Sequence, residues 1–132
     1  QTEGKSVVIN PVCQEDYTPA EEHFDMVFTS PPYYDCEKYC DEPTQSYIRY
    51  PTISKWSAGF LEPLVYNAWI ALKQGGYFVL NIANTKTAPR LEELSVIYAQ
   101  MMGFSLVDTI KLTLSSISGN GTKYEPMFVF KK

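Results

Sequence analysis

The chain has 132 residues, of which 45% are hydrophobic, 14% aromatic and 20% charged. This is the size and composition of one globular domain, and it excludes a disordered tail, a collagen-like repeat and a coiled coil. The uncharged apolar run at 64–72 is far shorter than the roughly 20 residues that a membrane span needs. The polar first residues show no secretory signal. We therefore expect a cytoplasmic protein with no membrane partner.

Charge is distributed unevenly along the sequence. Residues 1–72 carry a formal charge of −7 and residues 73–132 carry +3, for a net charge of −4. A protein that grips duplex DNA alone usually has a strongly basic face, so DNA binding by this chain needs help from elsewhere. The three cysteines, Cys13, Cys36 and Cys40, are an odd number in a chain without a signal, which indicates reduced thiols. We expect no metal site.

The spacing of apolar residues predicts alternating strands and helices, which favours an α/β sheet with parallel neighbours. Pro63 inside the first helix predicts a kink or two consecutive helices, and Gly75-Gly76 is expected to stop that helix. The last two strands are joined by a loop alone, so they should form an antiparallel hairpin. The predicted elements are strands at 6–10 and 25–29, a loop at 34–51, a helix from 52 or 54 to about 73, a strand at 77–82, a helix from 89 to about 102 that closes at Gly103, and strands at 105–114 and 124–130.

The tetrapeptide Ser30-Pro31-Pro32-Tyr33 follows the predicted strand at 25–29 directly. Ligands bind at the carboxyl ends of strands in an α/β sheet, and two prolines fix the backbone there. The Ser30 hydroxyl and the Pro31 carbonyl are suited to hold the two hydrogens of the exocyclic amine of a nucleobase. Tyr33 is suited to stack on a base swung out of the duplex. Such a site works by positioning and electrostatics, without a covalent intermediate.

Read from 24 to 33, the run FDMVFTSPPY resembles motif IV of the S-adenosylmethionine-dependent DNA amino-methyltransferases, which modify N6 of adenine or N4 of cytosine. Residues 72–81 resemble the glycine turn and strand of that fold, and residues 125–132 resemble its closing strand. Residues 34–39, together with 44–46, Trp56 and Phe60-Leu61, are similar to phage-type and bacterial members of the family. The resemblance covers 7–132 and implies DNA methylation of the restriction-modification kind, with S-adenosyl-L-methionine as cofactor and DNA as partner.

The resemblance also implies roles for individual residues. It assigns the catalytic pocket to Ser30, Pro31, Pro32 and Tyr33. An acidic residue after the preceding strand commonly holds the adenine of the cofactor, and Glu15, slightly preferred, and Asp16 match that position. Asn81 ends a strand at the expected ligand edge. The cofactor-binding set is thus Glu15, Asp16, Thr29 and Ser30, and the substrate-binding set is Tyr33, Tyr34 and Asn81.

The implied fold is α/β, a Rossmann-like methyltransferase sheet with an antiparallel last strand and the strand order three-two-one-four-five-seven-six. The sequence matches strands three to seven and shows no match for strands one and two. It also has no glycine-rich loop after a strand, which lets a backbone approach the cofactor closely. We interpret residues 1–132 as a partial catalytic domain, from motif IV to the final strand. An amino-terminal segment or a second copy, as in a homodimer, would complete the sheet.

Several alternatives stay open. Ser at the first position of the motif leans weakly towards cytosine-N4, so the base is undecided. A related proline-proline-aromatic loop serves methylation of RNA or of a protein amide nitrogen, although those families more often have Asn first. A degenerate, methyltransferase-like binding subunit is the non-enzymatic alternative. The missing strands and glycines favour it, and the intact motif opposes it.

Overall fold

The computed structural model describes residues 16–19, 21–34, 49–115 and 122–132. The predicted strand at 6–10, Glu15, the cysteines and most of the predicted loop at 34–51 lie outside the described residues. None of the described helices is long and apolar enough to cross a bilayer. In chain order the elements are β1 (Phe24–Thr29), α2 (Ile53–Trp56), the π-helical segment η2 (Ser57–Leu61), α3 (Glu62–Ala71), β2 (Leu72–Asn81), α4 (Leu91–Met102), β3 (Ser105–Ser115) and β4 (Thr122–Lys131).

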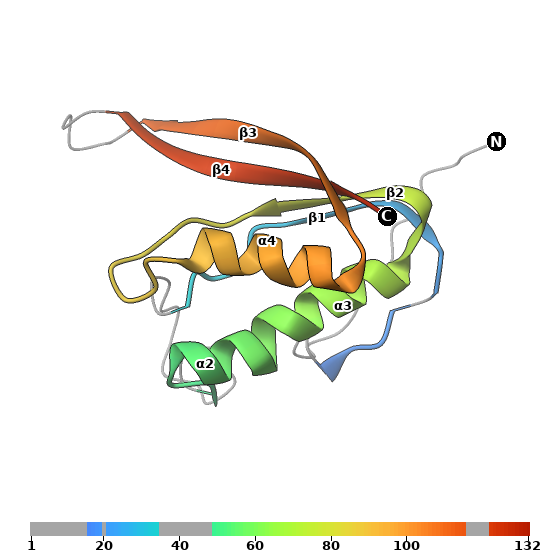
Figure 1. Ribbon diagram of the computed structural model, residues 1–132, viewed down its shortest axis with the longest axis horizontal. Helices are drawn as coiled ribbons and strands as arrows, with labels where there is room; N and C mark the ends of the chain where they lie inside the picture. The colour runs from blue at the N-terminus through green and yellow to red at the C-terminus, as the bar shows by residue number, and fades with distance from the viewer. Residues whose placement is uncertain (1–15, 20, 35–48, 116–121) are drawn as a thin grey trace.

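The strands form one mixed sheet in the order β1-β2-β4-β3. β1 and β2 are parallel, whereas β4 is antiparallel to both of its neighbours, β2 and β3. The predicted antiparallel hairpin of the last two strands is therefore confirmed. The order also corresponds to the four-five-seven-six part of the implied methyltransferase sheet. Helices α3 and α4 lie side by side against one face of this sheet (Figure 1).

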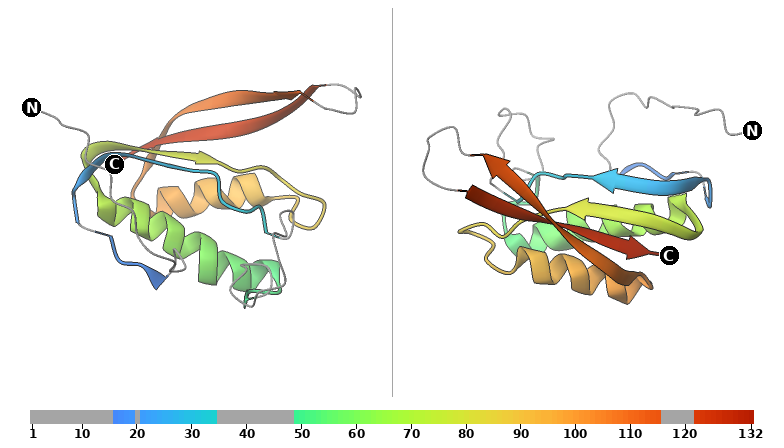
Figure 2. Two further views of the ribbon diagram at one scale, coloured as in Figure 1. Left: turned by 180° about the vertical axis from the view of Figure 1, so that it is seen from behind. Right: turned by 90° about the horizontal axis from the view of Figure 1, so that it is seen from above.

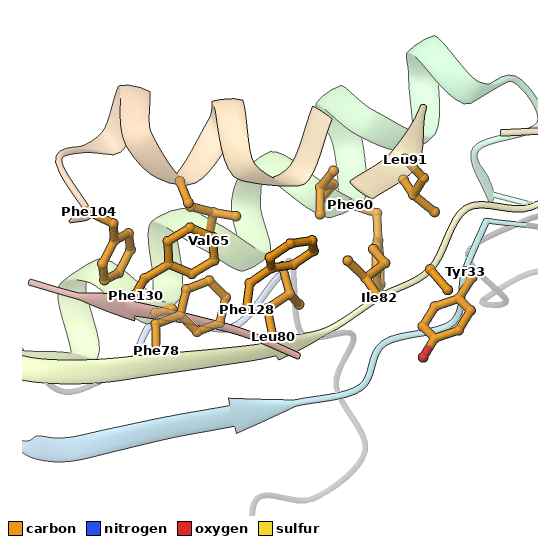
Figure 3. Close-up of a cluster of buried hydrophobic side chains, with 14 of the residues drawn as sticks. Tyr33, Phe60, Val65, Phe78, Leu80, Ile82, Leu91, Phe104, Phe128 and Phe130 are labelled. Atoms are coloured by element: carbon orange, nitrogen blue, oxygen red, sulfur yellow. The ribbon is translucent and has the colours of Figure 1, made fainter. Parts of the chain in front are cut away.

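Cross-strand register builds the core, because residues paired across neighbouring strands share a face of the sheet. Phe78 pairs with Val27 on one side and with Phe130 on the other. Phe78 and Phe130 are fully buried under the helices, and their stacked rings are 5.7 Å apart between centroids. Phe104, which follows α4, packs its ring on Phe78 at 5.3 Å. Figure 3 shows these rings in the layer between the sheet and the helices.

The first helical run begins where the sequence predicts it, with Thr52 as N-cap accepting a 3.2 Å hydrogen bond from the Lys55 amide. Trp56 and Phe60 are buried and stacked at 5.1 Å, so this helical run contributes two aromatic rings to the core. The expected irregularity near Pro63 is the π-helical segment η2, which ends immediately before α3. A proline in a helix has no amide hydrogen to donate and crowds the preceding turn, and the wider π turn lies at that point.

The prediction that Gly75-Gly76 stops this helix is wrong. α3 already ends at Ala71, and both glycines lie inside β2. Gly75 has a φ of +83°, which glycine adopts without strain. It lies where the pairing of β1 with β2 is irregular, and its amide donates to the Lys132 carbonyl over 3.0 Å. The glycines thus shape a bulge in the strand.

Lys132 satisfies the carboxyl end of α3. Its ammonium donates to the carbonyls of Trp69 and Leu72 over 2.7 and 2.8 Å, and it lies 4.9 Å from the Trp69 ring centroid. A cation is favourable here, because the last carbonyls of a helix have no partners of their own and the helix dipole is negative at this end. The end of the helix is therefore set by a residue distant in sequence.

Gly103 ends α4, as predicted. Its φ is +121°, and a Cβ there would come within 2.8 Å of the Trp69 ring. The following amide, that of Phe104, donates to the Ala99 carbonyl over 3.0 Å. Only glycine combines this backbone conformation with so close an approach.

In the described part of the chain, no helix covers the other face of the sheet (Figure 2). Met26 and Phe28 of β1 lie on that face with Tyr77 of β2, as their register shows. Their exposed fractions are 60%, 57% and 42%. Large apolar side chains gathered in this way usually mark a surface that contacts something else.

Replacing Phe130 by Ala should lower the free energy of unfolding by about 3–5 kcal/mol, because it removes a fully buried ring and leaves a cavity. Met101→Ala, at a residue that is 78% exposed, should change it by less than about 0.5 kcal/mol. Urea unfolding followed by circular dichroism measures both. Equal effects of the two changes would contradict the assigned core.

Candidate functional site

The candidate site lies at the carboxyl edge of the two parallel strands. Thr29, the last residue of β1, pairs with Leu80 of β2. Ser30, which follows β1, and Asn81, the last residue of β2, are joined by a 3.0 Å hydrogen bond from the Ser30 hydroxyl to Asn81 Oδ1. β4 runs antiparallel beside β2 and pairs Met127 with Asn81, so the first half of β4 reaches the same edge. The sequence predicted this location for the site.

Four side chains, two from the segment that follows β1 and one each from β2 and β4, form a polar cluster at this edge. The Tyr33 hydroxyl lies 2.8 Å from Asn81 Oδ1 and 2.9 Å from Glu125 Oε2, and Ser30 binds the same Asn81 oxygen. The Asn81 amide nitrogen donates to the Pro126 carbonyl over 3.1 Å. We call Ser30, Tyr33, Asn81 and Glu125 the polar cluster. The structure thus brings together three residues that the sequence predicted and adds Glu125.

Burial distinguishes one member of the cluster from the others. Tyr33, Asn81 and Glu125 have exposed fractions of 6%, 5% and 8%, whereas Ser30 is exposed. Buried polar groups normally have hydrogen-bond partners, and this cluster supplies them. Pro31, next to Ser30, is also buried. Three buried polar side chains thus support one exposed hydroxyl.

The Tyr33 ring lies at the edge of the apolar core, with its hydroxyl directed away from it (Figure 3). The predicted stacking role requires an open ring face, and Tyr33 is only 6% exposed. Stacking on a base therefore requires this ring to be uncovered first. The contacts in the structure assign Tyr33 an anchoring position, and the stacking role stays a prediction.

Tyr34, predicted to bind substrate, lies outside the polar cluster. Its hydroxyl donates to the Pro51 carbonyl over 2.8 Å, and its ring meets the edge of Trp56 at 6.1 Å. Its φ of +60° is in the left-handed region, which costs a non-glycine residue about 1–2 kcal/mol. Backbone strain of this kind concentrates at functional sites. Here it turns the chain sharply after the two prolines.

No family model and no curated protein matches this sequence, but solved structures match its fold. A methyltransferase from Pyrococcus furiosus is 20% identical, with a TM-score of 0.53 over 85% of this chain and 42% of that one. A candidate DNA modification methylase from Thermus thermophilus is 18% identical, with a TM-score of 0.59 over 90% of this chain and 48% of that one. The structure of that protein in complex with S-adenosyl-L-methionine is 20% identical, with a TM-score of 0.53 over 90% of this chain and 51% of that one. A candidate histamine N-methyltransferase from Thermotoga maritima is 15% identical, with a TM-score of 0.51 over 90% of this chain and 61% of that one.

The chain has a methyltransferase fold. It spans about half the length of these structures, with 42% to 61% of each covered. The names of these neighbours assign different substrates, and a shared fold does not decide among them. The choice of substrate has to be argued from the site itself.

On this methyltransferase fold, Asp16 is the described member of the predicted adenine-binding pair. Arg49 donates to both of its carboxylate oxygens, over 2.8 and 3.2 Å. This hydrogen bonding lowers the pKa of Asp16 below its usual range. Desolvation opposes the shift and the Arg49 charge adds to it. Asp16 remains accessible, with about half of its side chain exposed. Thr29 of the predicted cofactor set is half-buried.

Glu125 and Arg49 are the residues that sequence reasoning missed. Glu125 is an acidic residue inside an apolar strand, beside a proline, and that isolation was the available signal. Arg49 adjoins a segment with no clear period, and nothing in the sequence links it to Asp16. Within the described residues, no three His, Cys, Asp or Glu side chains gather in a way that suits a metal ion.

A separate hollow of about 320 Å³ lies between the start of α2 and the start of α4. Ile53, Leu91, Leu94 and Ile97 give it an apolar lining. None of the predicted site residues contributes to it.

Tyr33→Phe should lower the free energy of unfolding by about 1–3 kcal/mol, because it leaves Asn81 Oδ1 and Glu125 Oε2 buried without that hydroxyl. Tyr66→Phe, at a residue that is 49% exposed, removes the same atom from a side chain in solvent and should have little effect. Thermal and urea unfolding test the pair. A neutral Tyr33→Phe would show that the hydroxyl contributes nothing to this cluster.

Arg49→Gln should raise the pKa of Asp16 towards the ordinary aspartate value of about 3.9, because it removes the guanidinium that holds the carboxylate. The Asp16–Arg49 pair stabilises the fold fully above that ordinary value and loses its effect as the pH falls through the lower folded-state pKa. Carboxyl-carbon NMR titration measures the shift.

The matched control for this titration is Arg90→Gln. Arg90 holds Glu93 in the same two-point fashion, over 2.8 and 2.7 Å, and it lowers the pKa of Glu93. This variant should raise the pKa of Glu93 and leave Asp16 unchanged. An unchanged Asp16 pKa in Arg49→Gln would contradict the pairing.

Proposed function

We propose that this chain forms part of an enzyme that transfers the methyl group of S-adenosyl-L-methionine to an exocyclic amine of a DNA base, adenine N6 or cytosine N4. The observation that carries the proposal is the exposed Ser30 hydroxyl, which the buried Asn81 side chain holds at the carboxyl edge of a methyltransferase sheet. The sequence motif around it supports DNA as the substrate. So does the fold shared with a candidate DNA modification methylase.

The proposed chemistry needs the protein to change the geometry of a poor nucleophile. The lone pair of an exocyclic amine is delocalised into the base, so its nitrogen attacks weakly. Hydrogen bonds from its two hydrogens to the Ser30 hydroxyl oxygen and the Pro31 carbonyl favour a pyramidal nitrogen with a localised lone pair. Pro31 and Pro32 fix the backbone that carries both acceptors, so catalysis consists of positioning and electrostatics. The bound cofactor supplies an electrophilic methyl group.

The described residues fit one side of a cofactor site. Asp16 has two carboxylate oxygens with about four acceptor positions, and Arg49 occupies two of them. The remaining positions suit the amino group of an adenine or a ribose hydroxyl. Thr29 and Ser30 would face the reacting end. Glu15, the preferred partner from the sequence, lies outside the described residues and keeps its proposed role.

The rest of the sheet is part of the same proposal. An amino-terminal segment or a second copy of the chain would supply the strands that the sequence does not match. Two observations support this: the chain spans about half of its structural neighbours, and β1 forms an edge of the sheet among the described strands, where further strands would pair. We place this activity in the cytoplasm.

A non-catalytic binding subunit is the second candidate, and a specific observation favours it. The seven glycines form one G-x-G, Gly119-Asn120-Gly121, and it leads into β4. The loop that usually lets the backbone approach a cofactor joins a strand to a helix. Such a subunit would bind nucleic acid or a partner protein without binding the cofactor.

Ser30→Ala should lower methyl transfer about 100-fold or more, because it removes an acceptor that acts on the reacting amine. The affinity for S-adenosyl-L-methionine should fall far less than methyl transfer does, because Ser30 faces only the reacting end of the cofactor and Asp16 keeps its contacts. The measurements are calorimetric titration of the full-length protein with S-adenosyl-L-methionine, and transfer of a labelled methyl group to DNA. Digestion to nucleosides then separates methyladenine from methylcytosine.

Ser105→Ala is the matched control, because Ser105 begins β3 and pairs with Lys131, at the opposite edge of the sheet from the site. It should remain fully active. Cofactor binding without methyl transfer to any DNA, or full activity of Ser30→Ala, would refute the enzymatic proposal. Failure of the full-length protein to bind the cofactor would favour the binding subunit.

A further inference from the structure

The hydrogen bonds of Asn81 fix which way its amide points. Its nitrogen faces the Pro126 carbonyl at 3.1 Å, and a carbonyl oxygen only accepts hydrogen bonds. Turning the amide over would set its oxygen against that carbonyl, with no hydrogen between the two atoms. Oδ1 must therefore face the two hydroxyls, and at that position it acts only as an acceptor.

This orientation determines what Ser30 does with its single hydrogen. The Ser30 hydroxyl lies 3.0 Å from Asn81 Oδ1. Because that oxygen cannot donate, the Ser30 hydroxyl has to donate to it. The lone pairs of Ser30 Oγ are then directed away from the buried cluster. Ser30 is the exposed member of the cluster, so those lone pairs are available to an approaching group.

The Tyr33 hydroxyl does not displace the Ser30 hydroxyl from Asn81 Oδ1. The Tyr33 hydroxyl has one hydrogen and lies between two acceptors, Asn81 Oδ1 at 2.8 Å and Glu125 Oε2 at 2.9 Å. An amide oxygen has two lone pairs, so Asn81 accommodates Ser30 together with Tyr33. Glu125 holds Tyr33 from the opposite side and keeps the cluster closed.

We propose that Asn81 is a positioning residue that makes Ser30 an obligate hydrogen-bond acceptor for the substrate amine. A free serine hydroxyl either donates or accepts, and a donating hydroxyl would draw on the lone pair that the amine needs for attack. The Pro126 carbonyl fixes the orientation of the Asn81 amide, and Asn81 Oδ1 fixes the direction in which the Ser30 hydroxyl donates its hydrogen. The sequence suggested that Asn81 contacts the substrate, whereas here it acts through Ser30 at 5% exposure. This inference rests on the proposed methyl transfer.

The test is a double-mutant cycle in the full-length protein, scored by labelled methyl transfer to DNA. Asn81→Leu removes the acceptor and keeps a side chain of similar volume. It should lower kcat about 10- to 100-fold, the loss expected for a partner that orients a catalytic group, with the KM for DNA little changed. Combined with Ser30→Ala, it should cause no further loss, because its effect passes through the serine.

Ser30→Asp provides the decisive background. A carboxylate accepts hydrogen bonds without an orienting partner, so adding Asn81→Leu, which also removes the amide oxygen that would face this carboxylate, should cause no further loss of methyl transfer in this background. Gln74→Leu is the matched control. Gln74, near the start of β2 and away from the site, also donates to a backbone carbonyl, that of Lys132, over 3.1 Å. This change should leave kcat unchanged. Asn81→Ala replaces Asn81→Leu if the leucine variant does not fold by circular dichroism.

The outcomes separate the two proposals. An active wild type in which the losses of Ser30→Ala and Asn81→Leu multiply, or in which Ser30→Asp stays sensitive to Asn81→Leu, overturns the role of Asn81 and leaves the proposed function intact. A wild type that binds S-adenosyl-L-methionine and methylates no DNA overturns the proposed function, and the inference with it.

Discussion

The described structure depends on the register of β2 between β1 and β4. Side chains alternate along a strand, so the register that directs Phe78 and Leu80 into the aromatic core also directs Asn81 towards the polar cluster. A shift by one residue would put the asparagine amide against the helices and a phenylalanine into solvent. The apolar contacts of Phe130 with Phe78 therefore hold the hydrogen-bond geometry at the strand ends. Core packing and site geometry are set by the same pairing.

Local patterns predicted most of the fold. β1, α4 and the final hairpin follow from apolar periodicity and from the turn residues beside them, and Gly103 ends α4 for a local reason. The end of α3 could not be predicted in this way. Gly75-Gly76 resembles a helix stop, but the helix end is capped by Lys132, which is distant in sequence. Sequence patterns report local preference, and they do not identify a partner that the completed sheet supplies.

The sequence predicted the candidate-site residues that lie at the ends of strands, and it missed the residue that lies within a strand. Ser30 and Asn81 follow from the rule that parallel strands present their carboxyl ends at one edge. Glu125 lies inside an antiparallel strand, where it pairs with Leu112 of β3, and its burial depends on contacts such as that with the Tyr33 hydroxyl. For Tyr33, too, the sequence does not predict the contacts that the side chain makes in the fold. The motif identified the residue, but only the structure shows that its hydroxyl is buried between Asn81 and Glu125.

The position of β4 has a consequence for how the molecule is made. Among the described elements it is the last to leave the ribosome, yet it lies inside the sheet, between β2 and β3. Until it emerges, β2 has a free edge, β3 has no described neighbour, and the Asn81 amide lacks the Pro126 carbonyl. Pairings between such distant segments form slowly and expose the chain to wrong partners meanwhile. A nascent chain thus carries the whole tetrapeptide early and gains its oriented serine only after β4 has been synthesised and has paired with β2.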